Sequence, residues 1–187
     1  MRLLLPAVLL LLAAAACGAE QAAPPAAAPA TLPAVALPEL DSRSRSLDAA
    51  ALADDAFEPD ALAALLSEGG FVAGREREFS GKTATFDHVV ARTLVFESPS
   101  GADAYLGWVR GHGDEVLGRA APAKVVPPGE GGVAFTLERC GTCKKELPTF
   151  LAAWRREATV MTLLAAGDGA DAASFSALAH ELDEAAA

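Results

Sequence analysis

The chain has 187 residues, a formal net charge of −10 at pH 7 and three cysteines. This length accommodates one ordinary domain, or one domain with a tail. The acidic balance argues against binding to a nucleic acid backbone, which needs a basic face, and against attraction to anionic lipid head groups. Hydrophobic residues make up 52% of the chain, but much of this share is alanine, which buries little area.

The N-terminus has the three parts of a secretory signal peptide. Arg2 supplies a positive charge, the apolar run Leu3–Leu12 follows, and Ala13–Ala16 are the small residues that precede a cleavage site. The run is shorter than the roughly 20 apolar residues that a stable transmembrane helix needs. Residues 1–16 are therefore predicted to be a signal peptide that is removed from the mature protein.

A cysteine, Cys17, follows these small residues directly and precedes Gly18. This arrangement resembles the lipobox of bacterial lipoproteins, although Ala14 stands where that family most often has leucine. The resemblance implies that Cys17 is diacylated and holds the mature chain to the cell membrane or outer membrane without spanning it. The alternative is ordinary cleavage at the Ala-x-Ala site, which would release a soluble protein with an odd cysteine.

The segment from Gly18 to about Pro38 consists mainly of alanine and proline. Such a composition favours extended, semi-rigid conformations and buries too little area to fold. We therefore expect residues 17–40 to be a lipid-anchored linker. Residues 41–187 are expected to form a single extracytoplasmic domain.

The first half of this domain begins with a predicted helix. Asp60 is a candidate cap, and Gly69-Gly70 is a candidate end. Next, the alternating segment Phe71–Phe79 predicts a half-exposed strand, and the β-branched segment His88–Phe96 predicts a second strand. The leucines expected to be buried by the helix are Leu62, Leu65 and Leu66.

A second helix is expected to start at Ser98 or Ser100 and to loosen at Gly111 and Gly113. The proline-rich segment Pro122–Pro128 then separates the two halves of the domain. One side of this helix carries Ala104, Tyr105, Trp108 and Val109.

The second half repeats the order of the first. Val133–Arg139 and Thr159–Ala165 are predicted strands. The tetrapeptide Gly169-Ala170-Asp171-Ala172 is identical to Gly101-Ala102-Asp103-Ala104, and each copy is expected to open a helix. The apolar face of the last helix comprises Phe175, Leu178, Ala179 and Leu182. The prediction is an α+β domain with a mainly antiparallel sheet and flanking helices, for which two strand-strand-helix halves are one organisation.

The segment before the last predicted strand has two interpretations. Phe150, Leu151 and Trp154 have helical spacing, which would make Pro148 the first helical residue. The alternative is a hairpin with its tip near Arg156–Ala158. A strand that ends in Trp-Arg-Arg and turns into a hydrophobic strand and a C-terminal helix resembles secreted lipoproteins of GC-rich bacteria. That resemblance, over residues 56–182, implies a small extracytoplasmic α+β domain with no established catalytic constellation.

One motif contains a pair of cysteines with the spacing of a redox site. Cys140-Gly141-Thr142-Cys143-Lys144, with Pro148 five residues after the second cysteine, resembles the redox motif of the thioredoxin family. The resemblance implies a nucleophilic Cys140 thiolate and a resolving Cys143. However, no proline follows Pro148, and Arg139 stands where the family usually has an aromatic residue. The alternative, which we favour, is a small-loop disulfide between Cys140 and Cys143, formed outside the cytoplasm.

No metal or cofactor is expected from the sequence. A closed zinc site needs four ligands, of which the two cysteines supply half. His88, His112 and His180 show no ligand spacing and are expected to be ordinary surface or half-buried residues. The acidic pairs Asp54-Asp55 and Asp114-Glu115 could attract a cation, but solvated acidic faces are commoner.

These features together favour a cell-envelope lipoprotein whose domain is not an enzyme and binds an envelope protein or a small ligand. They indicate no nucleic acid partner. One alternative is a membrane-tethered thiol–disulfide oxidoreductase that uses Cys140 and Cys143. The other is a structural surface lipoprotein without a ligand.

Overall fold

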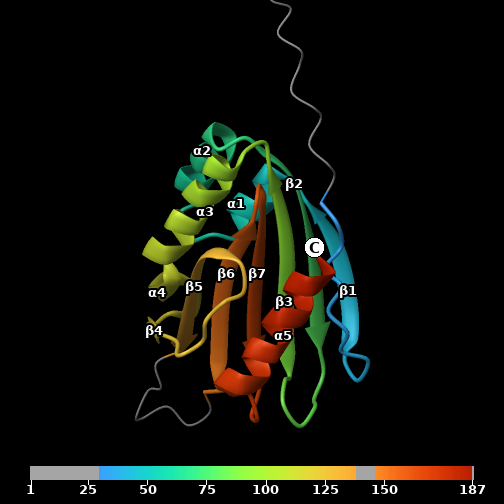
Figure 1. Cartoon of the computed structure of the whole chain (residues 1–187). Helices are drawn as coiled ribbons and strands as arrows, with labels where there is room; N and C mark the ends of the chain where they lie inside the picture. Colours follow the sequence, from blue (N-terminus) through green and yellow to red (C-terminus); the bar gives the residue numbers. More distant parts are fainter. Residues whose placement is uncertain (1–29, 138–145, 187) are drawn as a thin grey trace, which may run out of the picture.

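The strands with the strongest β-branched and apolar character lie at the centre of the sheet. In the computed structural model, which describes residues 30–137 and 146–186, the strands form one antiparallel sheet in the order β1-β2-β3-β7-β6-β5-β4. Helices cover both faces (Figure 1). The α+β class with a mainly antiparallel sheet is therefore confirmed.

Two pairs of consecutive strands are each followed in the sequence by a long helix. The strands and helices are β1 (Asp41–Leu47), α1 (Ala49–Asp54), α2 (Pro59–Glu68), β2 (Phe71–Ser80), β3 (His88–Phe96), α3 (Pro99–Gly111), α4 (Gly113–Leu117), β4 (Ala120–Pro122), β5 (Glu130–Leu137), β6 (Thr149–Arg156), β7 (Thr159–Ala166) and α5 (Ala172–Ala185). No helix among the described residues is long and apolar enough to cross a membrane.

Both faces of the central strands are buried, because alternate side chains of a strand point to opposite faces. On β3, Val89 and Ala91 pack in the core beneath α5, whereas Leu94 and Phe96 pack beneath α1, α2 and α3. The two helical layers therefore enclose two separate hydrophobic cores, one on each side of the sheet.

The segment before β1 belongs to the core on the α5 side. Val35 and Leu40 are buried there. The backbone N–H of Ala36 donates to Glu181 on α5 at 2.7 Å, and the Thr93 hydroxyl donates to the carbonyl of Thr31. The last residues of the expected linker, from about residue 31, are thus packed against the sheet.

The helix α2 does not start at Asp60, the residue expected to cap it. The N-cap of α2 is Glu58, without a side-chain cap, and Asp60 lies in the first turn after Pro59. The prediction of Ser98 as a cap is confirmed, because its hydroxyl accepts from the N–H of Gly101. Proline at the first helical position explains the shift in α2, because its fixed φ begins the helix one residue before Asp60.

The hairpin interpretation of the Trp-Arg-Arg segment is confirmed, and the helix beginning at Pro148 is wrong. β6 pairs with β7 from Thr149↔Ala166 to Arg156↔Thr159. The turn uses Glu157, whose φ is 51°. Strand pairing prevails over the helical spacing because alternation along β6 buries Ala152 and Trp154 on the α5 side and Ala153 on the opposite side.

The strand-strand-helix order occurs twice, as β2-β3-α3 and β6-β7-α5, but the two helices pack on opposite faces of the sheet (Figure 1). A twofold axis between the antiparallel strands β3 and β7 would place both helices on one face. The identical tetrapeptides also differ in role. Asp171 caps α5, whereas Gly101 lies inside α3, where a Cβ would come within 1.9 Å of the carbonyl oxygen of Gly69.

One buried carboxylate attaches α5 to the β6–β7 hairpin. Asp183 on α5 accepts from the indole Nε1 of Trp154 at 3.0 Å and from Nε of Arg156 at 2.8 Å. The hydrogen bonds from Arg156 lower the pKa of Asp183, and burial offsets part of that effect. The helix is therefore held by a charge-assisted contact as well as by its apolar face.

Replacing this carboxylate tests the attachment. Asp183→Asn should lower the free energy of unfolding by about 1–3 kcal/mol at pH 7, because Arg156 loses its counter-charge. The exposed neighbour Glu184 gives the control Glu184→Gln, which should change stability by less than about 0.5 kcal/mol.

The pH dependence of the same variant follows from the lowered pKa. A carboxyl group with a lowered pKa in the folded state stabilises the protein above its unfolded pKa, and this stabilisation is lost as the pH falls through the lowered value. The difference between the wild type and Asp183→Asn should therefore narrow at acidic pH. Urea denaturation at neutral and acidic pH measures this difference in the free energy of unfolding. A difference that persists unchanged at acidic pH would contradict the stabilising role of the Asp183 carboxylate.

Candidate functional site

A cavity of about 270 Å³ lies between the sheet and the helices on the α1–α4 side. Its floor is formed by β3, β6 and β7, and its walls by the α1–α2 loop, α3 and α4. The lining is largely apolar: Leu52, Ala56, Phe57, Leu62, Val90, Val109, Leu151 and Leu164, with Asp55, Arg92, Tyr105, Trp108, Glu115 and Thr162. An apolar pocket with a few polar groups is the usual form of a small-molecule site.

Two hydrogen-bond donors in the lining have no partner among the described residues. Tyr105 is 3% exposed, and its hydroxyl makes no hydrogen bond within the described part of the chain. The indole Nε1 of Trp108 is buried and likewise unpaired there. Burial raises the pKa of Tyr105, and the charge of Arg92 offsets only part of that rise, so the hydroxyl stays protonated and can donate.

The aromatic residues at the cavity form a continuous row along α3. The ring centroids of Tyr105 and Trp108 are 6.2 Å apart, and those of Trp108 and His112 are 4.5 Å apart in a stacked arrangement. Phe57, on the α1–α2 loop, is 74% exposed. An exposed phenylalanine beside an apolar cavity enlarges the apolar surface available to a ligand.

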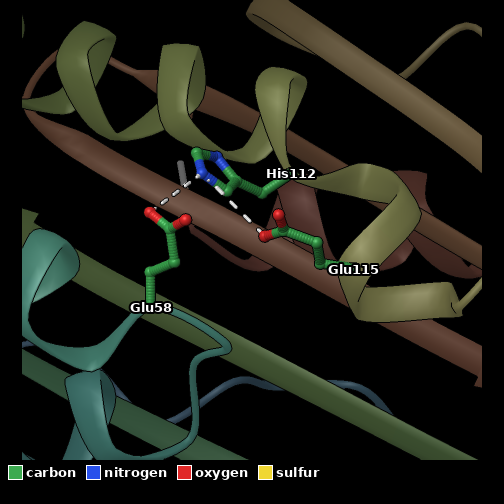
Figure 2. Close-up of side chains that lie close together, drawn as sticks. All are labelled: Glu58, His112 and Glu115. Atoms are coloured by element: carbon green, nitrogen blue, oxygen red, sulfur yellow. Dashed lines mark ion pairs between the residues drawn. The ribbon is translucent and has the colours of Figure 1, made fainter.

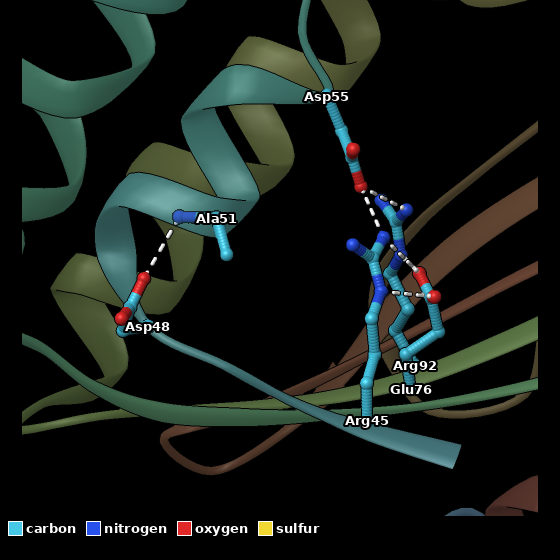
Figure 3. Close-up of polar contacts among 6 residues, drawn as sticks. All are labelled: Arg45, Asp48, Ala51, Asp55, Glu76 and Arg92. Carbon is cyan, nitrogen blue, oxygen red and sulfur yellow. Dashed lines mark hydrogen bonds and ion pairs between the residues drawn. The ribbon is translucent and has the colours of Figure 1, made fainter.

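A network of charges borders the cavity at the α1–α2 loop (Figure 3). Glu76 on β2 is buried and accepts from Nε of Arg45 and from Nε of Arg92, each at 2.6 Å. Asp55 pairs with the same two arginines, at 2.5 Å and 3.1 Å. Burial raises the pKa of Glu76, but the bonds and charges of the two arginines outweigh it and hold the pKa below its usual value.

A second cluster lies where α2, α3 and α4 approach one another (Figure 2). Nε2 of His112 is 3.9 Å from Oε2 of Glu58 and 3.9 Å from Oε2 of Glu115. Nδ1 of the same ring lies 2.8 Å from the carbonyl oxygen of Trp108. Glu115 also lines the cavity, so the cluster borders the same pocket.

The cysteines singled out in the sequence lie outside the described residues: Cys17, Cys140 and Cys143. Residues 138–145 stand in the sequence between β5 and β6, which pair antiparallel, and β6 begins at Thr149. The lipidation, the disulfide and the redox activity therefore stay predictions.

The histidines and acidic pairs are distributed over several surfaces. His88 pairs with Glu78 across β3 and β2 at 3.8 Å, and His180 is exposed on α5. Within the described residues, His112 is the one histidine that lies near two carboxylates, Glu58 and Glu115. Of the acidic pairs, Asp55 belongs to the arginine network and Glu115 to the His112 cluster.

Sequence reasoning missed most of this site. His112 and Glu115 are three residues apart, a spacing that brings side chains together on one helical turn, but Glu58 is remote in sequence. Tyr105 and Trp108 were correctly predicted on one side of a helix, yet no sequence signal shows that their donors are left unpaired.

The charge network gives a stability prediction. Glu76→Gln should lower the free energy of unfolding by about 1–3 kcal/mol, because Arg45 and Arg92 keep only Asp55 as counter-charge. Glu78→Gln, two residues along the same strand and with a side chain that is 44% exposed, is the matched control and should be close to neutral. Chemical denaturation at pH 7 measures both, and equal midpoints for the two variants would contradict the role of Glu76.

Comparison with known proteins identifies no family. No protein-family model matches the chain, and no curated protein matches it in sequence. Among solved structures, it is similar to the crystal structure of the extracellular domain of PknH from Mycobacterium tuberculosis. The sequence identity is 12% and the TM-score 0.47, over 78% of this chain and 85% of that chain. A likeness of this size assigns neither a family nor an activity.

Proposed function

We propose that the protein is an extracytoplasmic lipoprotein, not an enzyme, whose domain binds a small and mostly apolar ligand in the cavity on the α1–α4 side. The observation that carries the proposal is a largely apolar lining with two donors that lack a partner among the described residues, the hydroxyl of the buried Tyr105 and the buried indole N–H of Trp108. The signal-peptide pattern and the lipobox-like Cys17 support the location and the anchor.

The size of the cavity limits the ligand. A volume of about 270 Å³ lies just below the range of about 300–1,000 Å³ that is usual for drug-sized ligands. The ligand is therefore a small molecule of roughly ten non-hydrogen atoms, with more atoms only where it extends past Phe57 into solvent.

The donors define the polar part of the ligand. A buried donor without a partner costs about 1–3 kcal/mol, and a ligand with a carbonyl or ether oxygen removes that cost by accepting from Tyr105 or Trp108. Arg92, by contrast, already has two carboxylate partners, Glu76 and Asp55. A neutral acceptor suits this cavity better than a second anion does.

Acetophenone and cumene are matched probes for this cavity, since they have a similar size and the same branching but only acetophenone has an oxygen acceptor. Acetophenone should bind about 2- to 10-fold more tightly than cumene, and it should shift the indole N–H resonance of Trp108. The indole of Trp154, the other tryptophan of the chain, is bonded to Asp183 on the opposite face and serves as the internal control.

The variant Tyr105→Phe should reduce the preference for acetophenone while leaving cumene binding unchanged. Heteronuclear NMR titration measures both resonances in one experiment. If neither probe shifts the Trp108 resonance at millimolar concentration, the cavity does not bind such ligands, and a structural surface protein without a ligand is favoured instead.

The anchor has its own test. Expression of the full chain in a bacterium that processes lipoproteins should place the protein in the membrane fraction and should incorporate labelled fatty acid. Cys17→Ser should abolish the labelling and move the protein to the soluble extracytoplasmic fraction, because cleavage then leaves no acyl chain. Cys140→Ser is the matched control and should remain labelled. Membrane association of Cys17→Ser without label would contradict the lipobox interpretation.

A further inference from the structure

The cluster of Glu58, His112 and Glu115 is assembled from three separate elements (Figure 2). Glu58 is the N-cap of α2, His112 is the C-cap of α3, and Glu115 lies in α4. One ligand atom of each residue lies within 4.8 Å of those of the other two. Three potential metal ligands therefore converge on one point at the border of the cavity.

The orientation of the imidazole ring is determined from outside the cluster. Nδ1 lies 2.8 Å from the Trp108 carbonyl oxygen, which can only accept, so Nδ1 carries a hydrogen atom. The ring also stacks on the Trp108 indole, with an interplanar angle of 14°. In the neutral ring, Nε2 then presents its lone pair to the two carboxylates. A backbone carbonyl that holds one ring nitrogen while the other faces a cation is the usual arrangement around a metal-bound histidine.

The charges of the cluster are not balanced by the protein. Among the described residues, Glu58 and Glu115 have no positively charged neighbour within ion-pair distance other than His112. Both distances of 3.9 Å are too long for hydrogen bonds. Two carboxylates and an imidazole lone pair thus face a common point that needs a positive charge, either a metal ion or a proton on Nε2.

The distances favour a metal ion. A first-row dication holds nitrogen and oxygen ligands at about 2.0–2.2 Å, so opposing ligand atoms lie up to roughly 4 Å apart around it. The Glu58 side chain is 52% exposed, and a small rotation of it closes the remaining gap. Imidazole among the ligands selects zinc-like metals over Mg²⁺ and Ca²⁺, which prefer oxygen alone.

We propose that Glu58, His112 and Glu115 bind a first-row transition-metal dication such as Zn²⁺. Three protein ligands leave at least one coordination position open, and Glu115 places that position beside the cavity. The ion joins the start of α2 to the α3–α4 junction, and therefore stabilises the wall of the pocket on which Tyr105 and Trp108 lie.

Isothermal titration with Zn²⁺ alone tests the site at pH 7.5. The protein used has its three cysteines replaced by serine, because free thiols also bind zinc. One equivalent of Zn²⁺ should bind, and Glu58→Gln and His112→Gln should each weaken binding by 10-fold or more. Glu58→Gln changes an exposed residue and keeps the fold intact even if His112→Gln does not.

The control is His88→Gln, which removes the other histidine paired with a glutamate, at 3.8 Å from Glu78, and should leave Zn²⁺ binding unchanged. Substituting Co²⁺ should give d–d absorption bands that Glu58→Gln removes. The proposal is overturned if no Zn²⁺ binds, or if Glu58→Gln and His88→Gln weaken binding equally. Because only metal ions are used as probes, the result is independent of the organic ligand.

Discussion

The partly buried ion pair between Glu76 and Arg92 constrains the arrangement of half of the molecule. Arg92 lies on a central strand, on the same face as the buried Leu94, where an unpaired charge is costly. Glu76 is its register partner on β2, and Arg45 is the register partner of Glu76 on β1. A shift of one residue would move Glu76 to the opposite face of the sheet. The row of charges therefore specifies the pairing of three strands.

The same row determines where the helical layer ends. Asp55, directly after α1, pairs with both arginines, so the α1–α2 loop is held beside Arg92. The cavity opens at that point. Phe57 and Glu58 follow in the same loop and supply an apolar edge and a carboxylate. One short loop thus connects the charge network, the pocket and the His112 cluster.

The sequence predicts the fold better than the site because local patterns determine strands and helices. β3 was predicted with its observed bounds, since a β-branched run needs no remote information. The apolar face of α5 was predicted in full. Helical spacing in β6 misled one interpretation, because the pairing with β7 is a long-range contact that spacing does not contain.

The site depends on contacts between distant parts of the chain. Glu58 and His112 meet only because α2 and α3 pack side by side. That close approach requires a residue without a side chain at Gly101, because a Cβ there would collide with the backbone of Gly69. The Trp108 indole N–H is unpaired because no acceptor of the described residues lies within hydrogen-bond distance of it, and this depends on the tertiary structure. Single-sequence patterns can nominate His112 and Glu115 as neighbours on one turn, but the third ligand requires the tertiary structure.

The packed N-terminal segment and the cavity lie on opposite sides of the sheet. The segment from Thr31 to Ala36 runs on the α5 side, tied by Thr93 and Glu181, and the cavity opens on the opposite side. Residues 31–36 do not line the cavity, so the packed N-terminal segment leaves the pocket uncovered.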